Sequence, residues 1–183
     1  MTDAQAIREV LDGNDEAFRV LIQRYQSQVA ATVIGMLGSC PEADDVGQET
    51  FIRFYRSLNK FRGDSAVGTY LTRIAINLSL NELRRRRHRF GLFKNQDETK
   101  LRHLADHDMN PDTKETGEMV RKAIGELEPI FRSVIVLRLI DGYSTDETAG
   151  ILKIPQGTVL SRLARAQKKL KKIIGAKYEK SLP

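Results

Sequence analysis

Two helical stretches carry rows of side chains that could contact nucleic acid. In the first, between residues 69 and 87, outward positions recur at three- and four-residue steps and are occupied by Arg73, Asn77, Asn81 and Arg84. Side chains at this spacing share one helix face, and amides with guanidiniums suit base edges and phosphates. Arg85 continues a basic cluster that either contacts phosphate or forms a solvated helix end. Nearby, Phe61 and Tyr70 either stack on unpaired bases or belong to the core.

The second stretch lies near the carboxyl end. An inward stripe is predicted there from Val159, Leu163, Ala166 and Leu170, which leaves an outer face of Thr158, Ser161, Arg162, Arg165, Lys168 and Lys169. Ser144 and Glu147 form a capping box that starts a shorter helix, and a turn containing Gln156 and Gly157 follows that helix. Two short helices joined in this way predict a helix-turn-helix. Its second helix either enters a DNA groove or is only a solvated basic helix.

A third face has the opposite charge. Carboxylates fill the first turns of a helix expected to end at about Leu58, where the helix dipole favours negative charge. The outward residues of this helix are Asp44, Asp45, Gln48, Glu49 and Ile52. They are either ordinary exposed polar residues or, because an isoleucine lies beside them, a surface that binds another protein.

The sequence offers little support for an enzymatic function. His103 and His107 are four residues apart, but a third metal ligand is not apparent. The sequence contains no phosphate-binding glycine loop and no nucleophile paired with a base. We therefore expect no catalytic residue, no metal and no cofactor, and we do not expect an enzyme.

Composition agrees with an anionic partner without requiring one. The 183 residues include 30 Lys and Arg against 24 Asp and Glu, a formal net charge of +6. The single cysteine, Cys40, is expected at a helix end and cannot form an internal disulfide, which fits a reducing cytoplasm. The first residues do not form an export signal, and no apolar run approaches the ~18 residues of a membrane span. We expect a cytoplasmic protein without membrane insertion.

The apolar periodicity distributes these faces over two helical domains. Residues 1–90 are predicted to form the first domain, and residues 118–183 the second. Residues 91–117 are polar without a sustained apolar period, so they are expected to be a flexible linker. No strand-like alternation occurs, and the predicted fold is all-α: two small helical domains joined by that linker.

Five segments in this order resemble regions 2 and 4 of extracytoplasmic-function sigma factors, members of the sigma-70 family. The segments are residues 15–18 with Tyr25, then 42–51, 61–63, 69–77 and 154–163. The resemblance covers nearly all of both domains, with a linker in place of a middle domain. It implies a region 2 helical bundle followed by a region 4 helix-turn-helix.

The resemblance also implies roles for the three faces. The acidic helix, with Asp44, Asp45, Gln48, Glu49 and Ile52, would dock on the clamp helices of core RNA polymerase, and the flap would be a further contact. The melted −10 strand would be held by Phe61, Gly63, Asp64, Ser65, Tyr70, Arg73, Asn77, Asn81, Arg84 and Arg85. The −35 element would be read by Gln156, Gly157, Thr158, Ser161, Arg162, Arg165 and Lys169. Binding the melted strand better than the duplex would drive promoter opening.

Three positions depart from the family pattern. Tyr70 replaces a usual tryptophan, Val67 a common aromatic residue, and Leu160 a frequent lysine. The last change removes one expected phosphate contact. Family members are commonly held inactive by an anti-sigma factor, so we expect such a partner, with sequestration at the inner membrane face as an option.

Two other functions remain open. A helix-turn-helix regulator would bind duplex DNA without polymerase, but it leaves the acidic helix and the Asn77 face without a purpose. An RNA-modifying enzyme would use the basic surface, but it would need a catalytic constellation that the sequence lacks.

Overall fold

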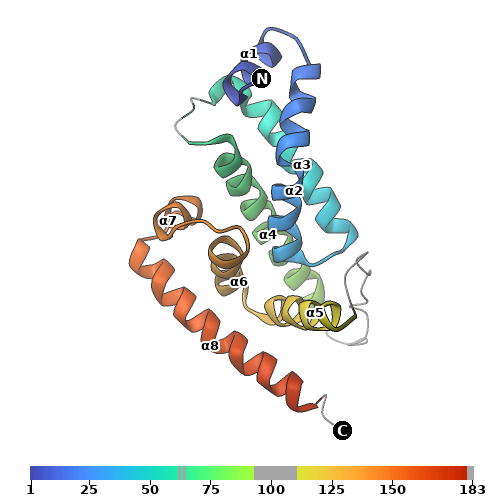
Figure 1. Cartoon of the computed structure of the whole chain (residues 1–183), viewed down its shortest axis with the longest axis vertical. Helices are drawn as coiled ribbons and strands as arrows, with labels where there is room; N and C mark the ends of the chain where they lie inside the picture. Colours follow the sequence, from blue (N-terminus) through green and yellow to red (C-terminus); the bar gives the residue numbers. More distant parts are fainter. Residues whose placement is uncertain (62, 64, 93–110, 181–183) are drawn as a thin grey trace.

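A computed structural model describes residues 1–61, 63, 65–92 and 111–180 of the chain. The first half consists of α1 (Asp3–Leu11), α2 (Glu16–Leu37), α3 (Pro41–Ser57), η1 (Leu58–Lys60) and α4 (Val67–Leu92). The second half consists of α5 (Pro111–Glu126), α6 (Pro129–Ile135), η2 (Val136–Ile140), α7 (Thr145–Leu152) and α8 (Gln156–Lys180). No strand occurs within these residues, so the predicted all-α fold is confirmed (Figure 1). None of the helices described is long and apolar enough to cross a membrane.

Local cap chemistry fixes several helix ends. The predicted capping box of α7 is present, because Ser144 Oγ accepts from the Glu147 amide at 3.2 Å while the Glu147 carboxylate accepts from the Ser144 amide at 2.8 Å. The hydrogen bond from the Ser144 amide, aided by the Ser144 hydroxyl, lowers the pKa of the Glu147 carboxyl. Cys40, which was predicted to lie at a helix end, is the N-cap of α3. Pro41 follows it in the first turn of the helix.

Three helices begin earlier than the sequence predicts, and one of them, α8, begins at Gln156, inside the predicted turn. α4 begins at Val67, and α5 begins at Pro111 rather than near Glu118. Proline fits the first turn of a helix, but the polar residues that follow Pro111 have no apolar period by which that turn could be recognised. The domain limits 1–90, 91–117 and 118–183 stay predictions, and the pair His103 and His107 lies outside the described residues.

The first half is a bundle in which α2, α3 and α4 pack against one another and α1 packs on α2 (Figure 1). Leu21, Phe54 and Leu71 are fully buried at its centre. α4 begins very close to α2, because a Cβ atom at Gly68 would lie 2.9 Å from Oε1 of Gln28. A larger residue at Gly68 would force the side chain of Gln28 to move.

The second half has two smaller apolar clusters. One lies between α5, α6 and α8 and includes Leu127, Phe131 and Ala166. The other holds α7 against α8 and includes Ala149 and Val159. These clusters hold α8 against both α6 and α7, so its outer face is presented on a fixed scaffold.

The two halves also pack against each other, which the sequence did not predict. α6 and η2 lie against α2, and α7 lies against α4 (Figure 1). Val136 and Leu137 of η2 belong to the same buried cluster as the first bundle. A Cβ atom at Gly35 of α2 would lie 3.0 and 3.2 Å from the two methyl carbons of Val136, so η2 nearly touches the α2 backbone.

Asp141 gives this contact a measurable pH dependence. Its carboxylate accepts from the Thr32 hydroxyl at 2.9 Å, and burial raises its pKa from 3.8 to about 6, although that hydrogen bond acts in the opposite direction. Because the folded pKa is raised, the ionised group destabilises the fold above about pH 6, and this penalty fades as the pH falls through 6 towards 4. Asp141→Asn removes the charge and keeps an oxygen that can accept from Thr32. We expect the variant to melt a few degrees above wild type at pH 7.5, since 1 kcal/mol is about 2–4 °C here.

The measurement is the melting temperature of both proteins at pH 7.5 and pH 4.5, with the exposed Asp12→Asn as control. The gain from Asp141→Asn should shrink at the lower pH, and the control should show no such difference. An equal effect of Asp141→Asn at both pH values would contradict the argument.

Candidate functional site

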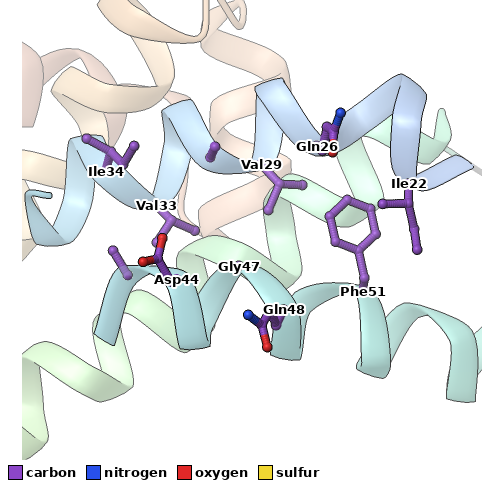
Figure 2. A pocket seen from close by; sticks show the side chains of 11 residues that line it. Ile22, Gln26, Val29, Val33, Ile34, Asp44, Gly47, Gln48 and Phe51 are labelled. Carbon is purple, nitrogen blue, oxygen red and sulfur yellow. The ribbon is translucent and has the colours of Figure 1, made fainter. Parts of the chain in front are cut away.

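A groove lies between α2 and α3. Its floor is apolar and formed by Ile22, Val29, Val33 and Phe51, while Asp44 and Gln48 of α3 stand along its edge (Figure 2). The close-up shows these side chains arising from two helices that lie side by side (Figure 2). An apolar floor with a carboxylate at the rim suits a partner helix that carries apolar and basic side chains.

The predicted acidic face therefore divides into two rows. Asp44 and Gln48 line the groove, whereas Asp45, Glu49 and Ile52 form the neighbouring row of α3. Asp45 is exposed, and Ile52 keeps 45% of its surface accessible. Glu49 is different, because its carboxylate accepts from Nε of Arg53 at 2.7 Å within the helix. That pair lowers the charge that Glu49 offers to a partner.

The α4 row predicted from spacing is only partly exposed. Asn77, Asn81 and Arg84 are exposed on one side of the helix, with Arg85 beside them. Arg73 is half-buried, and its Nε atom has no hydrogen-bond partner in the structure. The row can thus present two amides and a guanidinium to one ligand, while Arg73 lies deeper at its beginning.

A buried carboxylate organises the arginine cluster, and the sequence interpretation missed it. Glu82 is only 9% exposed, and it pairs with Arg89 at 2.7 Å, with Arg86 at 3.5 Å and with Arg85 at 4.0 Å. Arg86 also reaches Glu42 and donates to the sulfur of Cys40 at 3.0 Å. The spacing from Glu82 to these arginines, three, four and seven residues, is a signal that could have revealed the role of this side chain.

The loop before α4 rests on an aromatic cluster. The rings of Phe61 and Tyr70 lie 5.2 Å apart and contact Phe54 of α3 at 5.9 and 5.8 Å. Both aromatics are half-buried and therefore belong partly to the core; base stacking by them stays a prediction. Gly63 is exposed with a φ of 77°, Ser65 is half-buried, and Asp64 lies outside the described residues.

The carboxyl-terminal helices form the predicted helix-turn-helix. α7 ends at Leu152 and is capped by Lys153, which has a φ of 54°, and α8 begins at Gln156. Nε2 of Gln156 donates to Asp146 at 2.7 Å and so ties the start of α8 to α7. Val159 is fully buried between the helices, as the predicted stripe requires.

The outer face of α8 is not uniform. Gly157, Ser161 and Arg165 are exposed, whereas Thr158 and Arg162 are half-buried. Lys169 is exposed but already paired, because its Nζ lies 2.9 Å from a Glu128 oxygen and 5.1 Å from the centre of the Phe131 ring. Leu160 is 55% exposed, an apolar side chain in the first turns of this basic helix.

The residues described contain no group of three His, Cys, Asp or Glu side chains placed to hold a metal ion. The structure instead presents three separate surfaces: the α2/α3 groove, the α4 row and the outer face of α8. The groove is bordered by the carboxylate of Asp44, whereas the α4 row and the outer face of α8 both carry basic side chains.

Comparison with known sequences identifies the family of this chain. The Sigma-70 region 2 family matches residues 21–89, and the Sigma-70, region 4 family matches residues 117–170. The RNA polymerase sigma-H factor of Pseudomonas aeruginosa is 33% identical over 182 residues, which cover 94% of this chain and 93% of that protein. This chain belongs to the sigma-70 family, as an extracytoplasmic-function sigma factor. The ECF RNA polymerase sigma-E factor of Escherichia coli (strain K12) is 35% identical over 175 residues, 91% of each chain.

Solved structures agree with this assignment. The structure of CnrH in complex with the cytosolic domain of CnrY matches with a TM-score of 0.68 and 25% identity, over 95% of this sigma factor and 97% of that chain. The sigma factor RpoE of Bartonella quintana, solved with the anti-sigma factor NepR, has the same fold, with a TM-score of 0.67 and 22% identity over 86% and 96% of the chains. The predicted pair of helical domains, regions 2 and 4, is therefore confirmed.

Proposed function

We propose that this sigma factor binds core RNA polymerase through the α2/α3 groove and the acidic row beside it, and directs promoter-specific initiation. The observation that carries the proposal is α3, which combines an apolar groove wall with exposed Asp44 and Asp45. A polymerase helix with apolar and basic side chains would fill the groove and neutralise these carboxylates. The protein itself would act without catalysis.

On this proposal, DNA occupies the other two surfaces. The exposed amides of Asn77 and Asn81 would hold bases of the melted −10 strand, with phosphates on Arg84 and Arg85. Unstacking a base costs a few kcal/mol, so a surface that binds only the unstacked base favours opening. The exposed start of α8 would enter the −35 major groove, where Arg165 and Ser161 can reach DNA, while Lys169 is occupied by Glu128.

We also propose control by an anti-sigma factor that holds the protein in the cytoplasm at the inner membrane face. The support is the likeness in fold to the sigma factor RpoE of Bartonella quintana, which was solved in complex with the anti-sigma factor NepR. Copurification from stressed and unstressed cells tests this point. Recovery of polymerase alone under both conditions would count against it.

The central experiment is transcription in vitro with purified bacterial core polymerase on genomic fragments. Wild type should give discrete start sites. Asn77→Ala should keep normal core affinity and lose open complexes about tenfold, because a base contact is worth about 1–3 kcal/mol. Asn14→Ala, which changes an exposed asparagine after α1, should behave as wild type.

Permanganate reactivity of melted thymines measures opening directly. Equal opening by wild type and Asn77→Ala would contradict the role of the α4 row. A protein that binds duplex DNA but never binds core would instead be a helix-turn-helix regulator.

A further inference from the structure

An exposed leucine lies near the start of α8. Leu160 is in the second turn of this helix and keeps 55% of its surface accessible. The residue before it, Val159, is fully buried, and Leu163 packs against the two apolar clusters of region 4. Leu160 is therefore outside the apolar stripe that holds α8 on its scaffold, and packing within the chain does not explain an apolar side chain at this position.

The polar side chains around Leu160 already have partners within the chain. Nε2 of Gln156, one turn earlier, donates to Asp146 at 2.7 Å. The hydroxyl of Ser161 donates to the carbonyl oxygen of Thr158 at 3.1 Å. A hydroxyl has a single proton to donate, so Ser161 can offer a ligand only its acceptor sites. The exposed surface of Leu160 is free for an intermolecular contact.

Gly157 allows α8 to approach a ligand closely on the side where Leu160 lies. The two residues are three positions apart, so they share one side of the helix. Gly157 is exposed, and a Cβ atom there would meet nothing within 4 Å. Because no side chain stands between the helix backbone and a ligand at this point, the helix can lie deep in a groove. Leu160 would then reach base edges and not only the phosphates along the rim.

The chemistry of leucine limits what it can read in DNA. The residues near the start of the second helix contact base edges in helix-turn-helix proteins. Most features of these edges in the major groove are hydrogen-bond donors and acceptors, and thymine adds an apolar group, its C5-methyl. Leucine neither donates nor accepts a hydrogen bond, so its favourable contact is with that methyl group. Burying one methyl group is worth about a fourfold change in affinity.

We propose that Leu160 is a specificity-determining residue that selects a thymine within the −35 element by contact with the C5-methyl group of that base. The inference rests on the proposed function, because it requires the start of α8 to enter the −35 major groove. It adds a base preference to a helix whose other exposed groups are mainly hydroxyls and guanidiniums. A polar side chain of the same size at this position should abolish the preference.

Selection from duplex DNA with a randomised upstream element locates the thymine. The probe is holoenzyme assembled from the full chain and purified bacterial core polymerase. Wild type should select thymine at one position of the −35 element where Leu160→Asn shows no preference, whereas Leu160→Met, which keeps an apolar side chain, should still select it. Leu11→Asn changes a leucine of similar exposure, 53%, at the end of α1 and should behave as wild type. A selected element in which no thymine depends on Leu160 would overturn the proposal.

Uracil in place of that thymine removes only the methyl group. The dissociation constant of the wild-type holoenzyme for the duplex should rise about fourfold. That of Leu160→Asn should be raised already and should not change further with uracil. Equal sensitivity of the two proteins to uracil would overturn the proposal. Weaker binding of Leu160→Asn to core in the absence of DNA would also overturn it, because Leu160 would then contact polymerase.

The same DNA measurements on the free protein separate this inference from the proposed function. If wild type never binds core, but the free protein loses affinity with uracil and Leu160→Asn does not, the proposed function fails and the thymine contact stands. If the holoenzyme initiates at discrete sites and uracil has no effect at any selected thymine, the thymine contact fails and the proposed function stands.

Discussion

Asp45→Arg is expected to weaken binding to core RNA polymerase by about 3 kcal/mol, roughly a hundredfold in Kd, because reversing a charge at a complementary interface costs several kcal/mol. Asp45 is exposed on α3, one row away from the groove, so the change should leave the fold intact. Fluorescence anisotropy with labelled sigma factor and purified core measures the loss. Thermal melting of the variant checks that it is folded.

The matched control is Asp12→Arg, which makes the same change of charge at an exposed position after α1. It should bind core with wild-type affinity. If both variants lost affinity equally, the effect would come from overall charge and not from the acidic row. If neither did, α3 would not be the polymerase surface.

Arg132→Met is expected to lower the free energy of unfolding by about 2–4 kcal/mol, since buried polar groups that lose their partner cost about 1–3 kcal/mol each. Arg132 is 8% exposed and donates to three carbonyl oxygens: those of Met36, 2.6 Å away, of Leu127, 3.0 Å away, and of Gly125. Two of these oxygens lie at the end of α5, where helical carbonyls need a donor. Burial lowers the pKa of this guanidinium, and the charge of Arg86 adds to the effect.

Urea denaturation of the full chain measures this loss. Arg121→Met on the exposed side of α5 is the control, and surface substitutions of this kind are usually within about 0.5 kcal/mol of wild type. Arg132→Met should also weaken the contact between regions 2 and 4, because the hydrogen bond from Arg132 to the Met36 carbonyl joins α6 to α2. Stability within 1 kcal/mol of wild type would show that water can replace the guanidinium.

Most of the helices could be predicted because their signals are local. The apolar steps of α2, the capping box at Ser144 and the turn before α8 each depend on residues a few positions apart. The start of α5 lacked such a signal, since no apolar repeat follows Pro111. The packing of η2 against α2 could not be predicted, because Thr32 and Asp141 are far apart in the chain and neither residue type is specific for a contact.

The sequence predicted which residues form each binding face. It did not predict the ion pairs that some of these residues make within the chain. Periodicity indicates which side of a helix is outward; it does not show that Lys169 meets Glu128, or that Glu49 meets Arg53. These pairs form across or along helices between side chains that look equally exposed in the sequence. The roles of the individual site residues accordingly stay predictions for the experiments above.

The buried carboxylate of Glu82 changes how strongly DNA binding should depend on salt. Five arginines lie between residues 84 and 89. Glu82 pairs closely with two of them, Arg89 at 2.7 Å and Arg86 at 3.5 Å, whereas the third pair, with Arg85, is loose at 4.0 Å. Each phosphate neutralised on a single strand contributes about −0.7 to the slope of log affinity against log salt concentration, through release of bound counterions. The cluster should therefore contribute a slope of about −2 from three arginines, in place of the roughly −3.5 that five would give. A weaker salt dependence lets this surface hold melted DNA over a wider range of ionic strength.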